Sequence, residues 1–195
     1  QAHVDRLERS LETLGFARAM PPKADLRERV GETLAANDLG DAYVKLSVSR
    51  GVQPGKLTPD ERVDPTIVVV VKPLPRGGTE GESVWADSAK VRTVDTRKVP
   101  ADALPADAKT HNYLNGVLAR LALRRAAGDS AADAADEALL LDSQGHLCEG
   151  ASSNLFFVDG GELKTPTADL PLLPGVTRSV VLDLASDEGF PVERG

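Results

Sequence analysis

The spacing of apolar residues near the start of the chain predicts two helices. Apolar positions at helical intervals over residues 4–14 predict an amphipathic helix that ends at Gly15. A second helix is predicted over residues 26–37, because Asp25 and Glu28 have the spacing of a capping box at its start.

Strand patterns follow these helices. Residues 43–50 alternate between apolar and polar, which predicts a strand whose apolar face, including Val48, belongs to a core. Residues 66–72 are almost continuously apolar and predict a central strand covered on both faces. One more strand is predicted over residues 90–99. Helices and strands in this order indicate an α+β domain.

The pattern breaks at residues 100–108, which hold two prolines and show no periodicity. Such a stretch is typical of a linker between domains. We therefore predict three parts: a smaller N-terminal α+β domain over residues 1–99, a linker over residues 100–108, and a C-terminal domain over residues 109–195.

The second half repeats the mixture of helices and strands. A helix is predicted over residues 113–127, with a stripe formed by Leu114, Val117, Leu118 and Leu121, before Gly128. A solvated loop is expected over residues 130–135. Turn residues then separate two pairs of strands and predict two hairpins, over residues 137–151 and 154–165. A helix is already under way at Gln1 and a strand begins at Phe190, so we expect both domains to be incomplete at the two ends.

Composition narrows the function classes. The formal net charge of −7 and the pI near 5.0 argue against nucleic acid as a partner. The longest apolar run, residues 67–71, is too short to cross a membrane. A single cysteine, Cys148, excludes an intramolecular disulfide and favours a reducing, cytoplasmic location. The three histidines are dispersed, so we assign no metal.

Three short segments, residues 108–114, 148–154 and 173–178, carry the candidate chemistry. In this order and spacing they closely resemble the class IV aminotransferases, a family that includes branched-chain aminotransferases, D-amino-acid aminotransferases and aminodeoxychorismate lyases. The resemblance runs from His3 to Gly195. It implies an α+β or α/β, two-domain, fold type IV enzyme that depends on pyridoxal 5'-phosphate and forms a homodimer.

The resemblance implies specific roles around the cofactor ring. A lysine can form a Schiff base only if its amine is held near the carbonyl and kept partly unprotonated, and Lys109 matches that residue of the family. Glu149 matches the carboxylate at the pyridine nitrogen. Tyr113 matches the donor to the phenolic oxygen, with core packing as its alternative. Ser153 and Asn154 complete this part of the cofactor site.

The phosphate group of the cofactor is expected at the start of the last helix. Gly175 precedes Val176 and Thr177, whose backbone N–H groups lie in a first helical turn, a position that favours anions. The resemblance implies that both residues bind phosphate, and that Arg6 supplies a charged contact. A surface ion pair is the alternative for Arg6.

The branch of the family is less clear from the residues. The segment Tyr43-Val-Lys45 resembles a substrate-facing Tyr-x-Arg of branched-chain aminotransferases, whereas the segment 152–154 is similar to that of the lyases and D-amino-acid enzymes. We expect transfer of an amino group between a branched-chain L-amino acid and 2-oxoglutarate. Aminodeoxychorismate lyase is the alternative, and a D-amino-acid aminotransferase or a non-catalytic binding protein is the weaker one.

Overall fold

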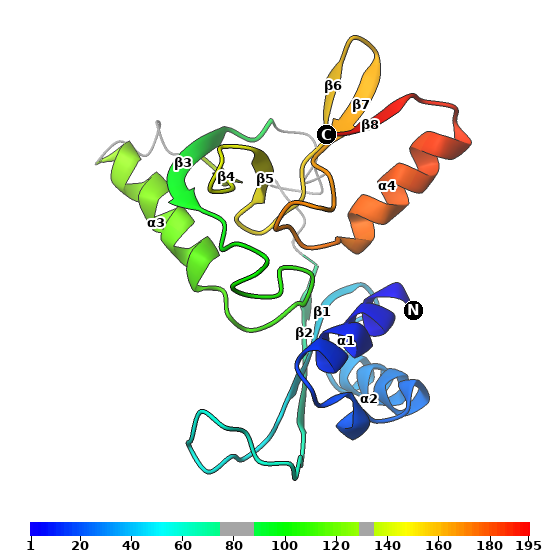
Figure 1. The fold of residues 1–195 in the computed structure, drawn as a ribbon. Helices are drawn as coiled ribbons and strands as arrows, with labels where there is room; N and C mark the ends of the chain where they lie inside the picture. The colour runs from blue at the N-terminus through cyan, green and yellow to red at the C-terminus, as the bar shows by residue number, and fades with distance from the viewer. Residues whose placement is uncertain (75–87, 129–134) are drawn as a thin grey trace. The chain divides into compact units, whose positions relative to one another are not determined.

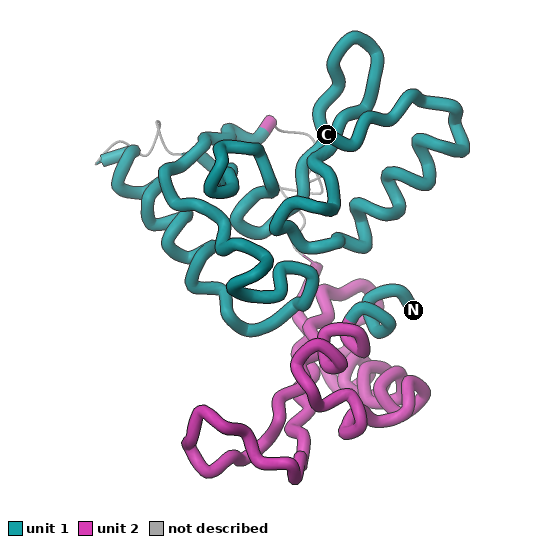
Figure 2. The backbone as a smooth tube through the Cα atoms, viewed as in Figure 1, with its two compact units in different colours: residues 1–6, 89–195 teal, residues 7–88 magenta. Residues whose placement is uncertain are grey.

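The structure is a computed structural model, and it describes residues 1–74, 88–128 and 135–195. Its chain forms two compact units, shown in Figure 2. Unit 1 consists of residues 1–6 and 89–195, and unit 2 of residues 7–88. The first helix, α1 (Ala2–Thr13), contributes to both. Most of the loop expected over residues 130–135 lies outside the described residues.

Unit 2 packs helices on an antiparallel pair of strands (Figure 1). Its core joins Leu11, Phe16 and Val48, so the apolar face predicted for residues 43–50 does contribute to a core. Gly15 ends α1 as predicted: its φ is 73°, and Phe16 N–H donates to the Leu11 carbonyl at 2.9 Å. The remaining elements of this unit are η1 (Ala17–Ala19), α2 (Lys23–Ala36), β1 (Ala42–Ser49) and β2 (Thr66–Pro73).

Two expectations for unit 2 are wrong. Helix α2 begins at Lys23, directly after Pro22, so Asp25 lies inside the first turn and does not cap the helix. The negative charge of Asp25 in the first turn still interacts favourably with the helix dipole. Among the described residues β2 pairs with β1 alone, and Val68 is 47% exposed, so β2 is not covered on both faces.

Unit 1 contains two small mixed sheets in its described part. In the first, β3 (Val91–Arg97) runs parallel to β4 (Glu137–Leu141), which pairs antiparallel with β5 (Leu147–Gly150). In the second, β6 (Phe157–Asp159) and β7 (Glu162–Thr165) form a hairpin, and β8 (Val192–Arg194) runs parallel to β7. Both predicted hairpins and the strand after Phe190 are therefore confirmed. Helix α4 (Val176–Asp187) leads from β7 to β8.

Helix α3 (Leu114–Ala127) packs on β3 and β4 through a face that holds Ala119 and Leu123 rather than through its predicted stripe. Ala119 is fully buried and Leu123 is 5% exposed, whereas Leu114 is 62% exposed. Gly116 lies so close to the loop after β5 that a Cβ there would be 2.8 Å from the Ala151 carbonyl oxygen. Small side chains let the helix approach the sheet, and this places the predicted stripe outside the core.

The chain passes from unit 2 to unit 1 at residue 89. The sequence pattern instead predicted a domain boundary at residues 100–108. The difference arises because β3 pairs with β4 and so joins the later part of the chain. A linker over residues 100–108 stays a prediction. Within the described residues, no helix has the length and apolar character needed to cross a bilayer.

Candidate active site

Glu149, near the end of β5, is a buried carboxylate. Its side chain receives donors from three separate segments. The Lys98 Nζ lies 2.5 Å from Oε1, and Oε2 accepts hydrogen bonds from the Leu173 N–H at 3.0 Å and from Asn154 Nδ2 at 3.2 Å. The residue is only 8% exposed, so it is not a surface carboxylate.

Lys98 is a residue that the sequence reasoning missed. It follows β3 directly, and its backbone N–H donates to the Leu141 carbonyl at 2.8 Å, which continues the pairing of β3 with β4. Its side chain is mostly buried against Glu149. No motif marks this lysine, because its neighbour depends on parallel pairing between strands about forty residues apart.

Asn154 links Glu149 to the start of α4. Its Nδ2 also donates to the Leu173 carbonyl at 2.9 Å. Gly175 is the residue before α4, and a Cβ there would lie 2.0 Å from the Asn154 Oδ1, so a larger residue would displace the Asn154 amide. Val176 and Thr177 open the helix, and the N–H groups of a first turn have no acceptor within the helix itself.

Lys109 lies before α3, in a setting that favours its neutral amine. Partial burial lowers the pKa of its ammonium group, cationic Arg6 lowers it further, and Glu149 acts in the opposite direction. The Lys109 Nζ is 5.8 Å from the centroid of the Tyr113 ring. The three charged groups come from α1, from the segment before α3 and from β5, and all belong to unit 1.

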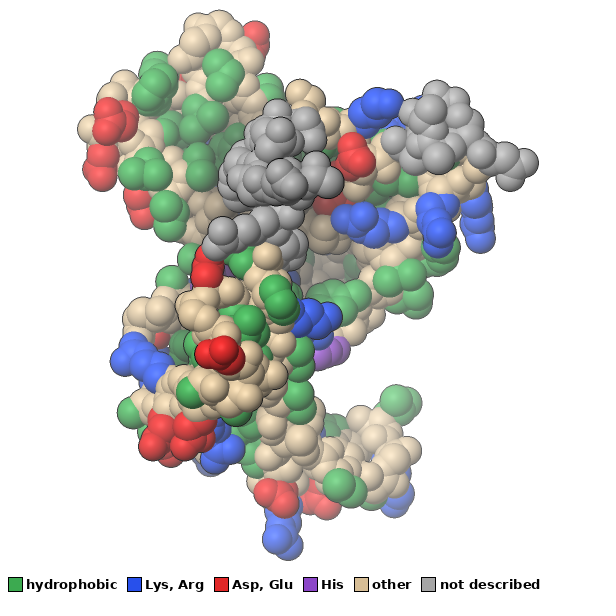
Figure 3. All heavy atoms as spheres, turned by 180° about the vertical axis from the view of Figure 1, so that it is seen from behind, with side chains coloured by type: hydrophobic (Ala, Val, Ile, Leu, Met, Phe, Trp, Pro, Cys, Tyr) green, Lys and Arg blue, Asp and Glu red, His purple; other side chains and the backbone are tan. Residues whose placement is uncertain are grey.

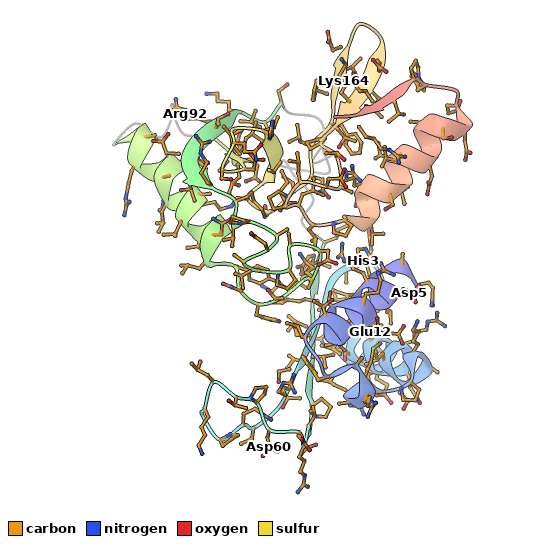
Figure 4. The ribbon with its side chains drawn as sticks, in the orientation of Figure 1. His3, Asp5, Glu12, Asp60, Arg92 and Lys164 are labelled. Carbon is orange, nitrogen blue, oxygen red and sulfur yellow. The ribbon has the colours of Figure 1, made fainter. Side chains whose placement is uncertain are left out.

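Arg6 reaches the segment that leads into α4. Its guanidinium donates to the Pro174 carbonyl at 3.5 Å and also lies 3.5 Å from the His3 Nδ1. His3 is labelled near the start of α1 in Figure 4. Burial, and then the charges of Arg6, the N-terminus and Lys109, lower the pKa of His3. Arg6 and the first turn of α4 therefore offer positive charge and N–H donors in one region.

Tyr113 and Ser153 differ in their surroundings. Tyr113 precedes α3 and is 46% exposed, which excludes the alternative of core packing. The Ser153 hydroxyl donates to Glu137 Oε2 at 3.1 Å. Tyr43 and Lys45, the predicted substrate residues, are exposed on one face of β1 in unit 2, and their contact with substrate stays a prediction.

Curated proteins with similar sequences match this chain over almost its whole length. The "Putative branched-chain-amino-acid aminotransferase" of Methanocaldococcus jannaschii is 38% identical over 97% of this chain and 61% of its own length. The aminodeoxychorismate lyase of Bacillus subtilis is 30% identical over 99% of this chain and 61% of its own. This chain thus spans about three fifths of the length of both relatives.

Solved structures agree in fold. The branched-chain aminotransferase of the thermophilic archaeon Thermoproteus uzoniensis, solved with norvaline, matches with a TM-score of 0.79 and 26% identity. The match covers 98% of this chain and 60% of that one. The family model described as amino-transferase class IV matches residues 1–195. This chain therefore belongs to the class IV aminotransferase family.

Proposed function

We propose that this protein is a pyridoxal-phosphate-dependent transaminase that moves an amino group between a branched-chain L-amino acid and 2-oxoglutarate. The observation that carries the proposal is the buried Glu149 carboxylate, which accepts from Asn154 Nδ2 and from the Leu173 N–H in the segment that leads into α4. The relatives named as branched-chain aminotransferases support the choice of substrate class.

The residues present fit pyridoxal phosphate by their chemistry. The lowered pKa of Lys109 leaves more of its amine neutral and able to react with the aldehyde of the cofactor. Arg6 and the N–H groups in the first turn of α4 can bind its phosphate. A carboxylate offers about four acceptor positions. Three donors reach Glu149, which leaves a position for a protonated ring nitrogen. Gly175 keeps a side chain out of the approach to α4.

When bound, the cofactor ring supplies a sink for the electron pair left on the substrate α-carbon. Lys109 would hold the cofactor through its amine and, after the substrate amine replaces it, take the α-proton at Nζ. Glu149 would hold a proton at the ring nitrogen, with Asn154 orienting its carboxylate. The Tyr113 hydroxyl would donate to the phenolic oxygen. The phosphate would be held by Arg6 and by the N–H groups of Val176 and Thr177, and the substrate by Tyr43 and Lys45.

The first test asks whether Lys109 is the residue that carries the cofactor. Protein mixed with pyridoxal phosphate and reduced with borohydride should gain the mass of the cofactor on the peptide that contains Lys109. Lys109→Ala should abolish this mass, while Lys72→Ala, at an exposed position on β2, should keep it. A covalent cofactor of undiminished yield in Lys109→Ala would contradict the assignment.

The second candidate function is that of an aminodeoxychorismate lyase, which forms 4-aminobenzoate and pyruvate. It is supported by the relative of that name and by the segment 152–154. We also propose a homodimer and a cytoplasmic location, on the family resemblance and the single cysteine. Sedimentation of the purified protein at several concentrations tests the dimer.

A further inference from the structure

Glu137, the first residue of β4, has a role that the proposed chemistry leaves unassigned. Its side chain is mostly buried, and its Oε2 accepts three hydrogen bonds from two other segments. The donors are the hydroxyls of Ser152 at 2.9 Å and Ser153 at 3.1 Å, and the Arg120 guanidinium of α3 at 3.4 Å. Arg120 also donates to the Ser152 hydroxyl at 3.0 Å.

The two serines belong to the loop that follows β5, residues 151–154. The loop folds back on itself, because the Gly150 N–H donates to the Ser153 carbonyl at 2.6 Å. It also packs tightly on Glu137: a Cβ at Gly150 would lie 2.4 Å from the Ser153 Oγ and 3.1 Å from the Glu137 Cγ. The Glu137 side chain therefore packs against Gly150, and its carboxylate accepts hydrogen bonds from the two exposed hydroxyls of the loop.

This loop connects Glu149, the buried carboxylate, with Asn154, which donates a hydrogen bond to it. Glu149 stands just before it and Asn154 ends it, and their side chains are hydrogen-bonded at 3.2 Å. A shift of the loop would move Asn154 relative to Glu149, Leu173 and Gly175, all of which it contacts closely. Glu149 is buried and Asn154 partly buried, whereas Ser152 and Ser153 lie on the exposed side of the loop. Buried polar groups such as the Glu149 carboxylate hold a site only when their hydrogen bonds are satisfied.

We propose that Glu137 is a positioning residue for the cofactor site, acting through loop 151–154 on Asn154 and Glu149. The proposal rests on the proposed function, because it assigns Glu137 to the binding of pyridoxal phosphate. It also gives the Ser153 hydroxyl a specific partner, Glu137, in place of direct contact with the cofactor. Arg120 would balance the charge of Glu137 from the side of α3.

The test is a double-mutant cycle on the dissociation constant of pyridoxal phosphate, measured by titration of the protein's absorbance. Glu137→Gln keeps the shape of the side chain and removes its charge, and it should weaken binding roughly tenfold, the loss expected of charge-assisted hydrogen bonds. In an Asn154→Ala background the same substitution should cost less than about twofold, since the loop no longer presents Asn154. Glu188→Gln, at an exposed carboxylate after α4, is the matched control.

The outcomes separate the two proposals. Failure of the unaltered protein to bind pyridoxal phosphate would overturn the proposed function itself. Normal binding by Glu137→Gln, or an equal loss with and without Asn154, would overturn only the role of Glu137. Should Glu137→Gln not fold, Ser153→Ala replaces it in the same cycle with the same expectation. A loss from Ser153→Ala that persists at full size in the Asn154→Ala background would indicate direct contact of Ser153 with the cofactor and overturn the proposal.

Discussion

Lys109 owes the lowered pKa of its ammonium group to influences of different kinds. Partial burial is the largest, because it penalises the charged form, and repulsion from Arg6 adds to it. Attraction to Glu149 opposes both. The amine is neutral above its pKa, so a lowered value leaves more of it reactive at a given pH than in an ordinary lysine.

Removing the charge of Arg6 should therefore make Lys109 less reactive near neutral pH. In Arg6→Met the pKa of Lys109 should rise towards its ordinary value, and the pH at which half of Lys109 reacts with an amine-modifying reagent should move up. The measurement is the labelled fraction of the Lys109 peptide, determined by mass spectrometry across a pH series. Arg92→Met, on β3 and labelled in Figure 4, is the control and should leave the midpoint in place. A midpoint that stays or falls in Arg6→Met would show that Arg6 does not act on Lys109.

At the scale of elements, the approach of α3 to its sheet depends on glycine and alanine. Gly116 faces the Ala151 carbonyl and Ala119 is fully buried, so there is no room for a larger side chain at these two positions. The loop that α3 contacts in this way leads to Asn154. The packing of α3 therefore affects the position of Asn154.

Two helical glycines give a matched test of this packing. Gly31, inside α2, has no atom within 4 Å of an added Cβ, whereas at Gly116 the Cβ would meet a backbone oxygen at 2.8 Å. Gly31→Ala should raise the free energy of unfolding by about 0.5–1 kcal/mol, because alanine favours the helix. Gly116→Ala should lower it by about 1–3 kcal/mol, the range for overpacking. Denaturant titration measures both, and a stabilised Gly116→Ala would contradict the close approach.

On the scale of the whole molecule, the charge is unevenly spread. The net charge is −7, yet Figure 3 shows Lys and Arg side chains beside hydrophobic ones on the part of unit 1 that holds α3 and β3. Some basic groups are paired with acidic ones, as Arg120 of α3 is with Glu137, and as is Lys164 of β7, labelled in Figure 4, whose Nζ lies 2.8 Å from a Glu193 carboxylate oxygen.

The reaction itself is a property of the whole protein and is best decided by products. Given leucine, isoleucine or valine with 2-oxoglutarate, the protein should form glutamate. Lys45→Ala should weaken the use of 2-oxoglutarate, because a cation near its distal carboxylate would be lost, while Lys56→Ala, at an exposed loop position, should not. Rapid formation of pyruvate and 4-aminobenzoate from aminodeoxychorismate, with glutamate at background, would replace the transaminase proposal by the lyase.

The sequence by itself determined the family and most of the elements. Periodicity and glycine signals act locally, so they located α1, α3 and both hairpins to within a few residues, and the three motifs were recognisable as a spaced set. Local patterns were less informative about which face of a helix is buried. The predicted stripe of α3 is exposed, because the face that packs on the sheet is the one with Gly116, Ala119 and Leu123.

Only the tertiary structure decided which side chains meet. The pairing of β3 with β4 brings Lys98 to Glu149, and the loop after β5 brings Ser152 and Ser153 to Glu137; neither contact leaves a motif in the sequence. Such contacts join residues far apart along the chain, and they exist only once strands have paired and a helix has packed. Residue types and spacing therefore identified the candidate chemistry, while pairing and packing determined the charges and hydrogen bonds that surround it.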